Sequence, residues 1–138
     1  MRHENESVTA YLKIVVPKDK ISGLLCTAFE GGSNYWMEGI RYTMPKHPTY
    51  KPCFEDGTPE PKYLWVPLNE GGLVEIAIDD GDGILKWFPL TLLAIQSGLA
   101  KMSEKHPDHF KDFMEENDDA GTGDVFLQMC LFGEVVYS

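Results

Sequence analysis

Apolar side chains recur at helical spacing in four stretches of the chain. In the first stretch, residues 19–29, the apolar positions share one helix face and Asp19 is placed to cap the helix. These positions are Ile21, Leu24, Leu25, Ala28 and Phe29. A second helix is predicted over residues 91–105 with Thr91 as its cap, and a short third helix begins at Pro107. Residues 125–137 predict a fourth helix that is buried on most of its circumference.

Two glycines, Gly31 and Gly32, interrupt the first helical pattern. The same face continues beyond them at Gly32, Tyr35, Trp36 and Ile40, so we expect the helix to continue to residue 40. Each glycine inside a helix costs about 1 kcal/mol relative to alanine, which favours close packing or a bound group at this point. The alternative is a helix that stops at Gly31.

We expect the two glycines to allow close packing between the first and last helices. Gly133 shares a face of the last helix with Phe126, Met129 and Val136. We therefore expect Gly32 and Gly133 to lie opposite each other, with the two axes closer than the usual distance of about 8–10 Å. A Gly32→Leu substitution should then destabilise the domain by about 1–3 kcal/mol or more through overpacking.

Four stretches rich in β-forming residues predict strands. They cover residues 11–16, 63–68, 73–78 and 83–88. The sequence "DDGDG" supplies a tight turn between the last two. The sequence therefore predicts an α+β fold, with a small antiparallel sheet of about four strands packed against about four helices.

The 138 residues are expected to form a single domain, 1–138, because this length suffices for one hydrophobic core. Residues 1–9 are polar and are expected to be frayed. Residues 41–62 hold most of the prolines and predict a long irregular loop, either a surface elaboration or a functional segment.

The charge balance limits the partners of the chain. Twelve basic residues against 22 acidic ones give a formal net charge of -10. Nucleic-acid affinity comes largely from Lys and Arg, so we expect no direct nucleic-acid binding. The acidic surface is either simply well solvated or an imitation of nucleic acid that attracts basic proteins. No apolar run is long enough to cross a bilayer, so no membrane association is expected.

Catalytic and metal-binding patterns are weak. Cys26 and Cys130 fall on apolar helix faces, and Cys53 follows His47 at a spacing too loose to indicate a catalytic pair. The three cysteines lack a C-x-x-C spacing, which favours a reducing compartment. His109 and a nearby aspartate could share a helix face but lack further ligands. We expect no enzymatic activity, no metal and no cofactor.

A polar group beside two aromatics is the strongest candidate site. If the first and last helices touch, these side chains gather around one seam, where an aromatic face beside carboxylates and amides suits a flat base. The candidate ligand-binding residues are Glu30, Asn34, Tyr35, Trp36, Asn117, Asp119, Thr122, Asp124 and Gln128. The alternative is structural: Thr122 and Asp124 cap the last helix, Glu30 accepts from nearby backbone, and Trp36 belongs to the core.

Two motifs, "AFEGGSNYW" and "DAGTGDVFLQMCLFGEVVYS", resemble those of a group of small, functionally uncharacterised proteins encoded by tailed bacteriophages and prophages. Those proteins pair A-[FL]-E-G-G-x-x-Y-W with D-A-x-T-A-D-x-x-x-Q-x-x-[FL]-F-G-E-[IV]-V-Y-G. Here the motif positions are Glu30, Gly31, Gly32, Asn34, Tyr35, Trp36, Asp119, Ala120, Thr122, Asp124, Gln128, Phe132, Gly133, Glu134 and Tyr137. The chain departs from the pattern at Gly123, where alanine is usual, and at Ser138, where many relatives have glycine. Gly123 is expected to loosen the start of the last helix.

The resemblance implies expression in the cytoplasm of a bacterial host and an accessory role against host defences. We expect a non-enzymatic protein that binds a small nucleotide-like signal, with Arg41, Lys46 and Lys51 as the local cations for its phosphates. The alternative is an acidic inhibitor of the nucleic-acid-mimic type, which would use residues 104–124 against a host nuclease or defence complex. Self-association into a homo-oligomer is also compatible with the sequence.

Overall fold

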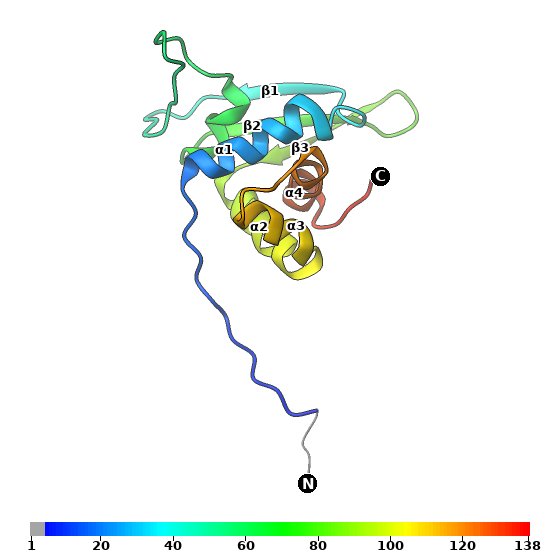
Figure 1. The fold of residues 1–138 in the computed structure, drawn as a ribbon. Coiled ribbons are helices and arrows are strands. Elements are labelled where there is room, and N and C mark those ends of the chain that lie inside the picture. Colours follow the sequence, from blue (N-terminus) through cyan, green and yellow to red (C-terminus); the bar gives the residue numbers. More distant parts are fainter. Residues whose placement is uncertain (1–4) are drawn as a thin grey trace.

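The computed structural model describes residues 5–138, and Figure 1 shows their arrangement. Three antiparallel strands form an open sheet in the order β1-β2-β3. The strands are β1 (Gly39–Thr43), β2 (Leu73–Asp79) and β3 (Leu85–Leu90), and the α-helices are α1 (Lys18–Thr27), α2 (Leu92–Lys105), α3 (Pro107–Met114) and α4 (Ala120–Phe132). The predicted α+β class is confirmed, with three strands in the described sheet instead of about four. Within residues 5–138, no helix combines the length and apolarity that a bilayer span requires.

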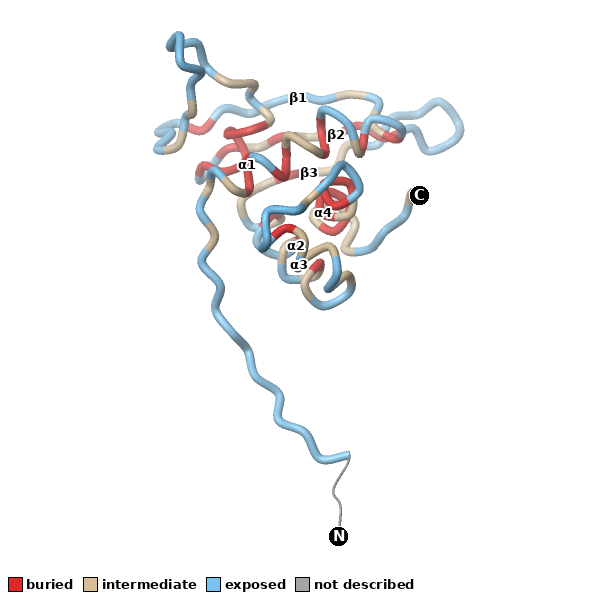
Figure 2. The backbone as a smooth tube through the Cα atoms, viewed as in Figure 1, coloured by how far each residue is buried: buried red, intermediate tan, exposed pale blue. Residues whose placement is uncertain are grey.

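Side chains of the central strand β2 point alternately to the core-facing side and to the outer side of the sheet. Val74, Ile76 and Ile78 alternate along β2 and belong to the hydrophobic core shared with the helices. On the outer side, Arg41 forms an ion pair with Glu75 at 3.0 Å, and its guanidinium lies 4.0 Å from the ring centre of Trp87. Figure 2 shows the buried backbone concentrated in β2, α1 and α4.

Two of the predicted strands do not form. Residues 63–68 instead make two 3-10 turns, η2 (Lys62–Leu64) and η3 (Val66–Leu68), because Pro67 has no N–H to donate to a ladder and the run is apolar without alternation. Residues 11–16 are extended but make no backbone hydrogen bond within residues 5–138. The expected fraying of residues 1–9 falls partly on residues 1–4, which lie outside the described residues.

The other strand predictions are close to the structure. Residues 73–78 are confirmed as β2, and the strand predicted from residue 83 begins two residues later because Gly83, with φ of 78°, belongs to the turn. Strand β1 was not predicted, since its residues fell at the end of the expected first helix and the start of the expected loop. Residues 44–61 are irregular, as predicted for most of that loop, with one isolated bridge between Cys53 and Pro59.

The first helix ends earlier than predicted. Pro17, not Asp19, is its N-cap, and α1 passes into a π-helical turn, η1 (Ala28–Gly32), in which the N–H of Ser33 donates to the carbonyl of Ala28 at 2.9 Å. The helical conformation therefore continues past Gly31 and ends at Gly32. The prediction of one helix to residue 40 is wrong. The apolar residues beyond Gly32 have helical spacing, but they lie in a turn and in β1.

The predicted Gly32–Gly133 contact is also wrong. A Cβ on Gly32 would lie 1.9 Å from the carbonyl oxygen of Ala120, so Gly32 faces the start of α4. Gly133 instead ends α4 in a left-handed conformation with φ of 74° and lies near Lys101. The last helix thus begins at Ala120 and ends at Phe132, whereas the sequence predicted residues 125–137.

The expected close approach of the two helical segments is nevertheless present at a different glycine. A Cβ on Gly123 would lie 2.7 Å from the backbone nitrogen of Ala28 and 2.3 Å from the hydroxyl of Thr27. Gly123 therefore permits the tight contact between α1 and α4. We expected Gly123 to loosen the start of the last helix, but it lies within the regular helix α4. The starts of α2 and α3 match the sequence: Thr91 accepts from the Ala94 N–H at 3.2 Å, and Pro107 lies in the first turn of α3.

Replacing Gly32 with alanine should separate η1 from α4, because the new methyl group would overlap the Ala120 carbonyl. We expect Gly32→Ala to lower the free energy of unfolding by about 3 kcal/mol or more. Gly31→Ala is the matched control: its Cβ would meet the Ala120 Cβ at 3.8 Å, an ordinary contact, and the change should be neutral or stabilising by up to about 1 kcal/mol. Urea denaturation of both variants tests this, and equal stabilities would contradict the contact.

Candidate functional site

The carboxylate of Asp124 is the centre of a buried polar cluster. Its Oδ1 accepts from the hydroxyl of Ser33 at 2.8 Å, from Trp36 Nε1 at 2.7 Å and from Gln128 Nε2 at 3.1 Å. Its Oδ2 accepts from the hydroxyl of Tyr35 at 2.8 Å. Four donors surround one carboxylate, so the buried charge is compensated by hydrogen bonds. The π-helical turn η1 brings three of these donors to α4, because the chain turns back immediately after Gly32.

Gln128, one helical turn after Asp124, holds the C-terminal segment against α4. Its Oε1 accepts from the backbone N–H groups of Val136 and Tyr137 at 2.7 and 2.8 Å. Its Nε2 donates to the Tyr137 carbonyl at 3.0 Å as well as to Asp124. All four hydrogen-bonding positions of this amide are occupied, which is typical of a structural glutamine with no exposed surface.

The aromatic face that was expected to receive a ligand is covered by the chain itself. The Trp36 ring stacks on Tyr137 with ring centres 5.4 Å apart and an angle of 7° between the planes. Phe132 contacts both rings, at 5.7 and 6.0 Å between centres. A flat ligand could stack on this face of Trp36 only after Tyr137 moves away.

A second, smaller polar group fixes the start of α4 to α3. Asp119 caps α4: its Oδ1 accepts from the backbone N–H of Thr122 at 2.9 Å and from the hydroxyl of Thr122 at 3.2 Å. His109 Nδ1 lies 3.0 Å from the same hydroxyl. This distance fits a hydrogen-bond chain in which His109 donates to the Thr122 hydroxyl and that hydroxyl donates to Asp119. These hydrogen bonds, the backbone one first, lower the pKa of Asp119.

The structure brings part of the predicted site together. Tyr35, Trp36, Asp124 and Gln128 form the Asp124 cluster, and Asp119 and Thr122 form the neighbouring cap. Asn34 and Asn117 are exposed and donate or accept no side-chain hydrogen bond within residues 5–138. Glu30 is also exposed and accepts from the thiol of Cys26, on a different side of the π-helical turn.

The structural alternative for these residues differs from the structure in two respects. Asp119, and not Thr122 or Asp124, caps α4, and Glu30 accepts from the Cys26 thiol instead of from backbone. Two members of the cluster were not predicted. Ser33 lies inside the first motif at a variable position, so the motif gave no signal for it. Tyr137 is a motif residue next to Ser138, and its aromatic character was a signal that could have placed it beside Trp36.

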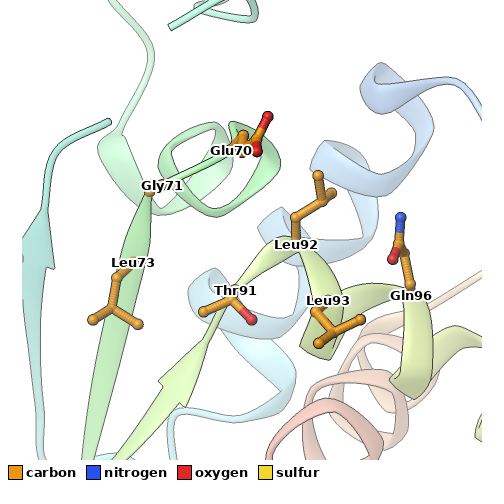
Figure 3. Close-up of a pocket in the computed structure, with 8 residues that line it drawn as sticks. Glu70, Gly71, Leu73, Thr91, Leu92, Leu93 and Gln96 are labelled. Atoms are coloured by element: carbon orange, nitrogen blue, oxygen red, sulfur yellow. The ribbon is translucent and has the colours of Figure 1, made fainter. Parts of the chain in front are cut away.

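Two hollows of the surface lie away from the Asp124 cluster. Figure 3 shows a shallow, mostly apolar pocket of about 430 Å³ between the start of β2 and the start of α2, where Leu73, Leu92 and Leu93 form the walls. A second groove of about 560 Å³ lies along α1 and the loop that contains Tyr50. The Tyr50 hydroxyl donates to Asp19 at 2.6 Å in this groove. Neither hollow is lined by any of the nine predicted ligand-binding residues.

Cys26 and Cys130 have little nucleophilic character. Desolvation, followed by the contact with Glu30, raises the pKa of Cys26 to about 11. Burial also raises the pKa of Cys130. Thiols with raised pKa values are protonated at neutral pH and react slowly. No group of three His, Cys, Asp or Glu side chains within residues 5–138 is placed to hold a metal ion.

Comparisons with protein-family models, with curated proteins and with solved structures gave no match to this chain.

Removing the Asp124 carboxylate should destabilise the protein strongly. Asp124→Ala leaves the donors of Ser33, Trp36 and Gln128 unsatisfied, so we expect a loss of about 3 kcal/mol or more in the free energy of unfolding. Asp124→Asn keeps an oxygen at the Oδ1 position and should lose only about 1–2 kcal/mol. Chemical denaturation with tryptophan fluorescence measures both. If the alanine variant is no less stable than the asparagine variant, the cluster does not stabilise the fold.

The phenol of Tyr35 should make stability depend on alkaline pH. Desolvation and the hydrogen bond to Asp124 raise the pKa of Tyr35 to about 12. Because the folded state prefers the protonated phenol, this stabilisation is complete below about pH 10, the unfolded pKa, and disappears as the pH rises to 12. The stability difference between wild type and Tyr35→Phe should therefore shrink between pH 10 and pH 12. A difference that stays constant over this range would contradict the assignment.

Proposed function

We propose that this protein acts by binding, as an acidic inhibitor of a basic host protein such as a nuclease or a component of a defence complex. The observation that carries the proposal is a continuous acidic surface on α3 and on the segment that joins α3 to α4. The resemblance to phage accessory proteins supports the same kind of role, exerted in the host cytoplasm and without catalysis.

Helix α3 separates its apolar and acidic residues onto opposite faces. Phe113, which is 1% exposed, packs into the core, and Phe110 packs beside it. Asp108, Asp112 and Glu115 follow at positions i, i+4 and i+7, on the face opposite to Phe113. The acidic surface continues after the helix through Glu116, Asp118 and Asp119. Regularly spaced carboxylates along one surface are suited to a groove that ordinarily binds phosphates.

The carboxylates of this surface are not neutralised within the described chain. None of the six takes part in an ion pair with a Lys or Arg among residues 5–138. Lys20, which packs against α3, donates to the carbonyl of Met114 at 2.9 Å and lies over the ring of Phe113. With six carboxylates against the single exposed lysine of α3, Lys111, the surface adds to the field of a chain with a net charge of -10.

The small-ligand form of the proposal has weaker support. A nucleotide-like signal at the Asp124 cluster would have to displace Tyr137 from Trp36. One of the three cations expected to bind its phosphates, Arg41, is already engaged by Glu75 and Trp87. The acidic surface, by contrast, is available without any rearrangement.

The acidic surface can be tested by neutralising it at constant size. The surface variant carries Asp108→Asn, Asp112→Asn, Glu115→Gln and Glu116→Gln. The matched control loses the same charge at exposed carboxylates elsewhere, with Glu38→Gln, Glu55→Gln, Glu70→Gln and Asp82→Asn. Proteins retained from a bacterial lysate by the wild-type chain are identified by mass spectrometry, and their affinities for the three proteins are compared by titration calorimetry.

We expect the surface variant to bind the retained partner at least about tenfold more weakly and the control variant to bind nearly as well as wild type. Raising the salt from about 0.1 M to about 0.5 M should also weaken the wild-type complex, because screening shortens the reach of the field. Equal losses in the two variants, or a complex indifferent to salt, would contradict the proposal. Retention of a small molecule at the Trp36 side would favour the ligand-binding alternative instead.

A further inference from the structure

The N-terminal segment, residues 7–16, is an arm that packs against the core only at its end, where Val16 contacts the core and Ile14 is 50% exposed. Figure 1 shows it running away from the start of α1, and Figure 2 shows it exposed along nearly its whole length. Tyr11, Leu12 and Val15 are 95%, 85% and 81% exposed. No backbone hydrogen bond joins the arm to residues 5–138. In a single copy of the chain, this segment exposes a large apolar surface to water, and its backbone groups pair with solvent and not with a neighbouring strand.

The arm has the composition of a strand. Residues 11–16, "YLKIVV", are β-branched, aromatic or otherwise apolar except for Lys13. In an extended chain, alternate side chains point to opposite sides. Leu12, Ile14 and Val16 then form one wholly apolar side, and Tyr11, Lys13 and Val15 form a mixed one. This pattern fits an edge strand with one side on a hydrophobic core and one side in water.

The sheet offers two free edges, and they differ. At the β3 edge, Pro89 has no N–H and Lys86 carries a charge, two features that hinder the addition of a strand. Strand β1 contains no proline, and in Figure 1 no element lies beyond it. On its core-facing side, Ile40 and Tyr42 each remain 36% exposed. The β1 edge is therefore open to pairing and leaves apolar surface uncovered.

We propose that the arm of each copy adds to the free edge of β1 in a second copy, so that two chains exchange arms and each sheet gains its fourth strand. Pairing would satisfy the free backbone groups on both sides, and it would place Leu12 and Ile14 beside Ile40 and Tyr42. The exchange is reciprocal, because each copy has one arm and one open β1 edge, and it therefore closes as a two-fold dimer.

The direction of the arm and the distribution of charge favour a second copy over the arm's own sheet. The arm leaves α1 pointing away from β1 of the same chain (Figure 1). Lys13 is the only charged residue of the arm, which is therefore weakly basic, whereas the rest of the chain carries the acidic excess. Two acidic bodies repel each other, and an arm with one positive charge joins them while keeping them apart.

Substitutions in the arm test this without disturbing the fold, because the changed side chains contact almost nothing in one copy. The arm variant carries Tyr11→Ser, Leu12→Ser and Val15→Ser. The control variant carries three equally polar changes at exposed apolar residues elsewhere, Phe54→Ser, Ile84→Ser and Leu93→Ser. Analytical ultracentrifugation of the full chain at about 100 µM should give twice the 15.6 kDa mass for wild type and control, and 15.6 kDa for the arm variant.

Complementation between two defective proteins identifies β1 as the receiving edge. The edge variant carries Ile40→Lys, which places a charge beside the incoming strand. Circular dichroism verifies that this variant is folded. If Ile40→Lys does not fold, Tyr42→Lys is used as the edge variant instead. Each variant alone should be monomeric. An equal mixture of the arm variant and the edge variant should form a heterodimer, because one supplies an intact edge and the other an intact arm.

Salt distinguishes this dimer from the proposed complex with a basic partner. Screening reduces the repulsion between two acidic bodies, so the dimer should strengthen between about 0.1 M and 0.5 M salt, while a complex with a basic protein should weaken. A monomeric wild type at about 100 µM would overturn the inference. So would a dimer that survives the arm substitutions, a mixture that remains monomeric, or a monomer whose arm amides are protected from hydrogen exchange by its own sheet.

Discussion

The contact between the π-helical turn η1 and the first turns of α4 determines where the other elements lie. Gly32 faces the carbonyl of Ala120, and Gly123 faces Thr27 and Ala28, so two backbones approach more closely than any side chain would permit. This approach brings Ser33, Tyr35 and Trp36 within hydrogen-bonding distance of Asp124. The polar cluster, the aromatic stack and the position of the C-terminal segment all follow from it.

A buried carboxylate at this contact is a device for specificity as well as for stability. An apolar core tolerates many packings of similar energy, whereas Asp124 is satisfied only when its four donors converge, three from the turn that follows η1 and one from α4 itself. The motif positions that resemble those of phage proteins include Tyr35, Trp36, Asp124, Gln128 and Tyr137. In this structure they are partners of one another, which accounts for their occurrence together without requiring a ligand.

Much of the fold could be predicted because local signals and tertiary structure agree. Thr91 and Pro107 mark the starts of α2 and α3, and the alternation in residues 73–78 marks β2. Elsewhere a local pattern was compatible with several structures. The spacing of Tyr35, Trp36 and Ile40 continued the helical register, but a turn at Ser33 redirects the chain. Residues 63–68 were correctly identified as apolar, yet an apolar run without alternation does not distinguish a strand from buried turns.

The candidate site, too, could be predicted only in part from the sequence. Sequence alone placed Trp36, Asp124 and Gln128 at one seam, because both motifs carry polar and aromatic residues near small ones. It could not show that Tyr137 covers Trp36 or that Glu30 faces away toward Cys26, since both depend on the path of the chain after Gly32 and after Gly133. Residues 11–16 differ again: their strand-like pattern is plain, but a strand needs a neighbour that this chain does not present to them.

The spacing of the Asp124 partners along the chain has a consequence for the order of folding. Trp36, Tyr35 and Ser33 are 88, 89 and 91 positions from Asp124, so closing the cluster restricts nearly the whole intervening polypeptide at once. The hairpin of α2 and α3 is local and free to form early, whereas the carboxylate finds its donors only after the long-range topology is established. The cluster is then a late-forming lock, which slows unfolding more than it accelerates folding and so prolongs the lifetime of the native state.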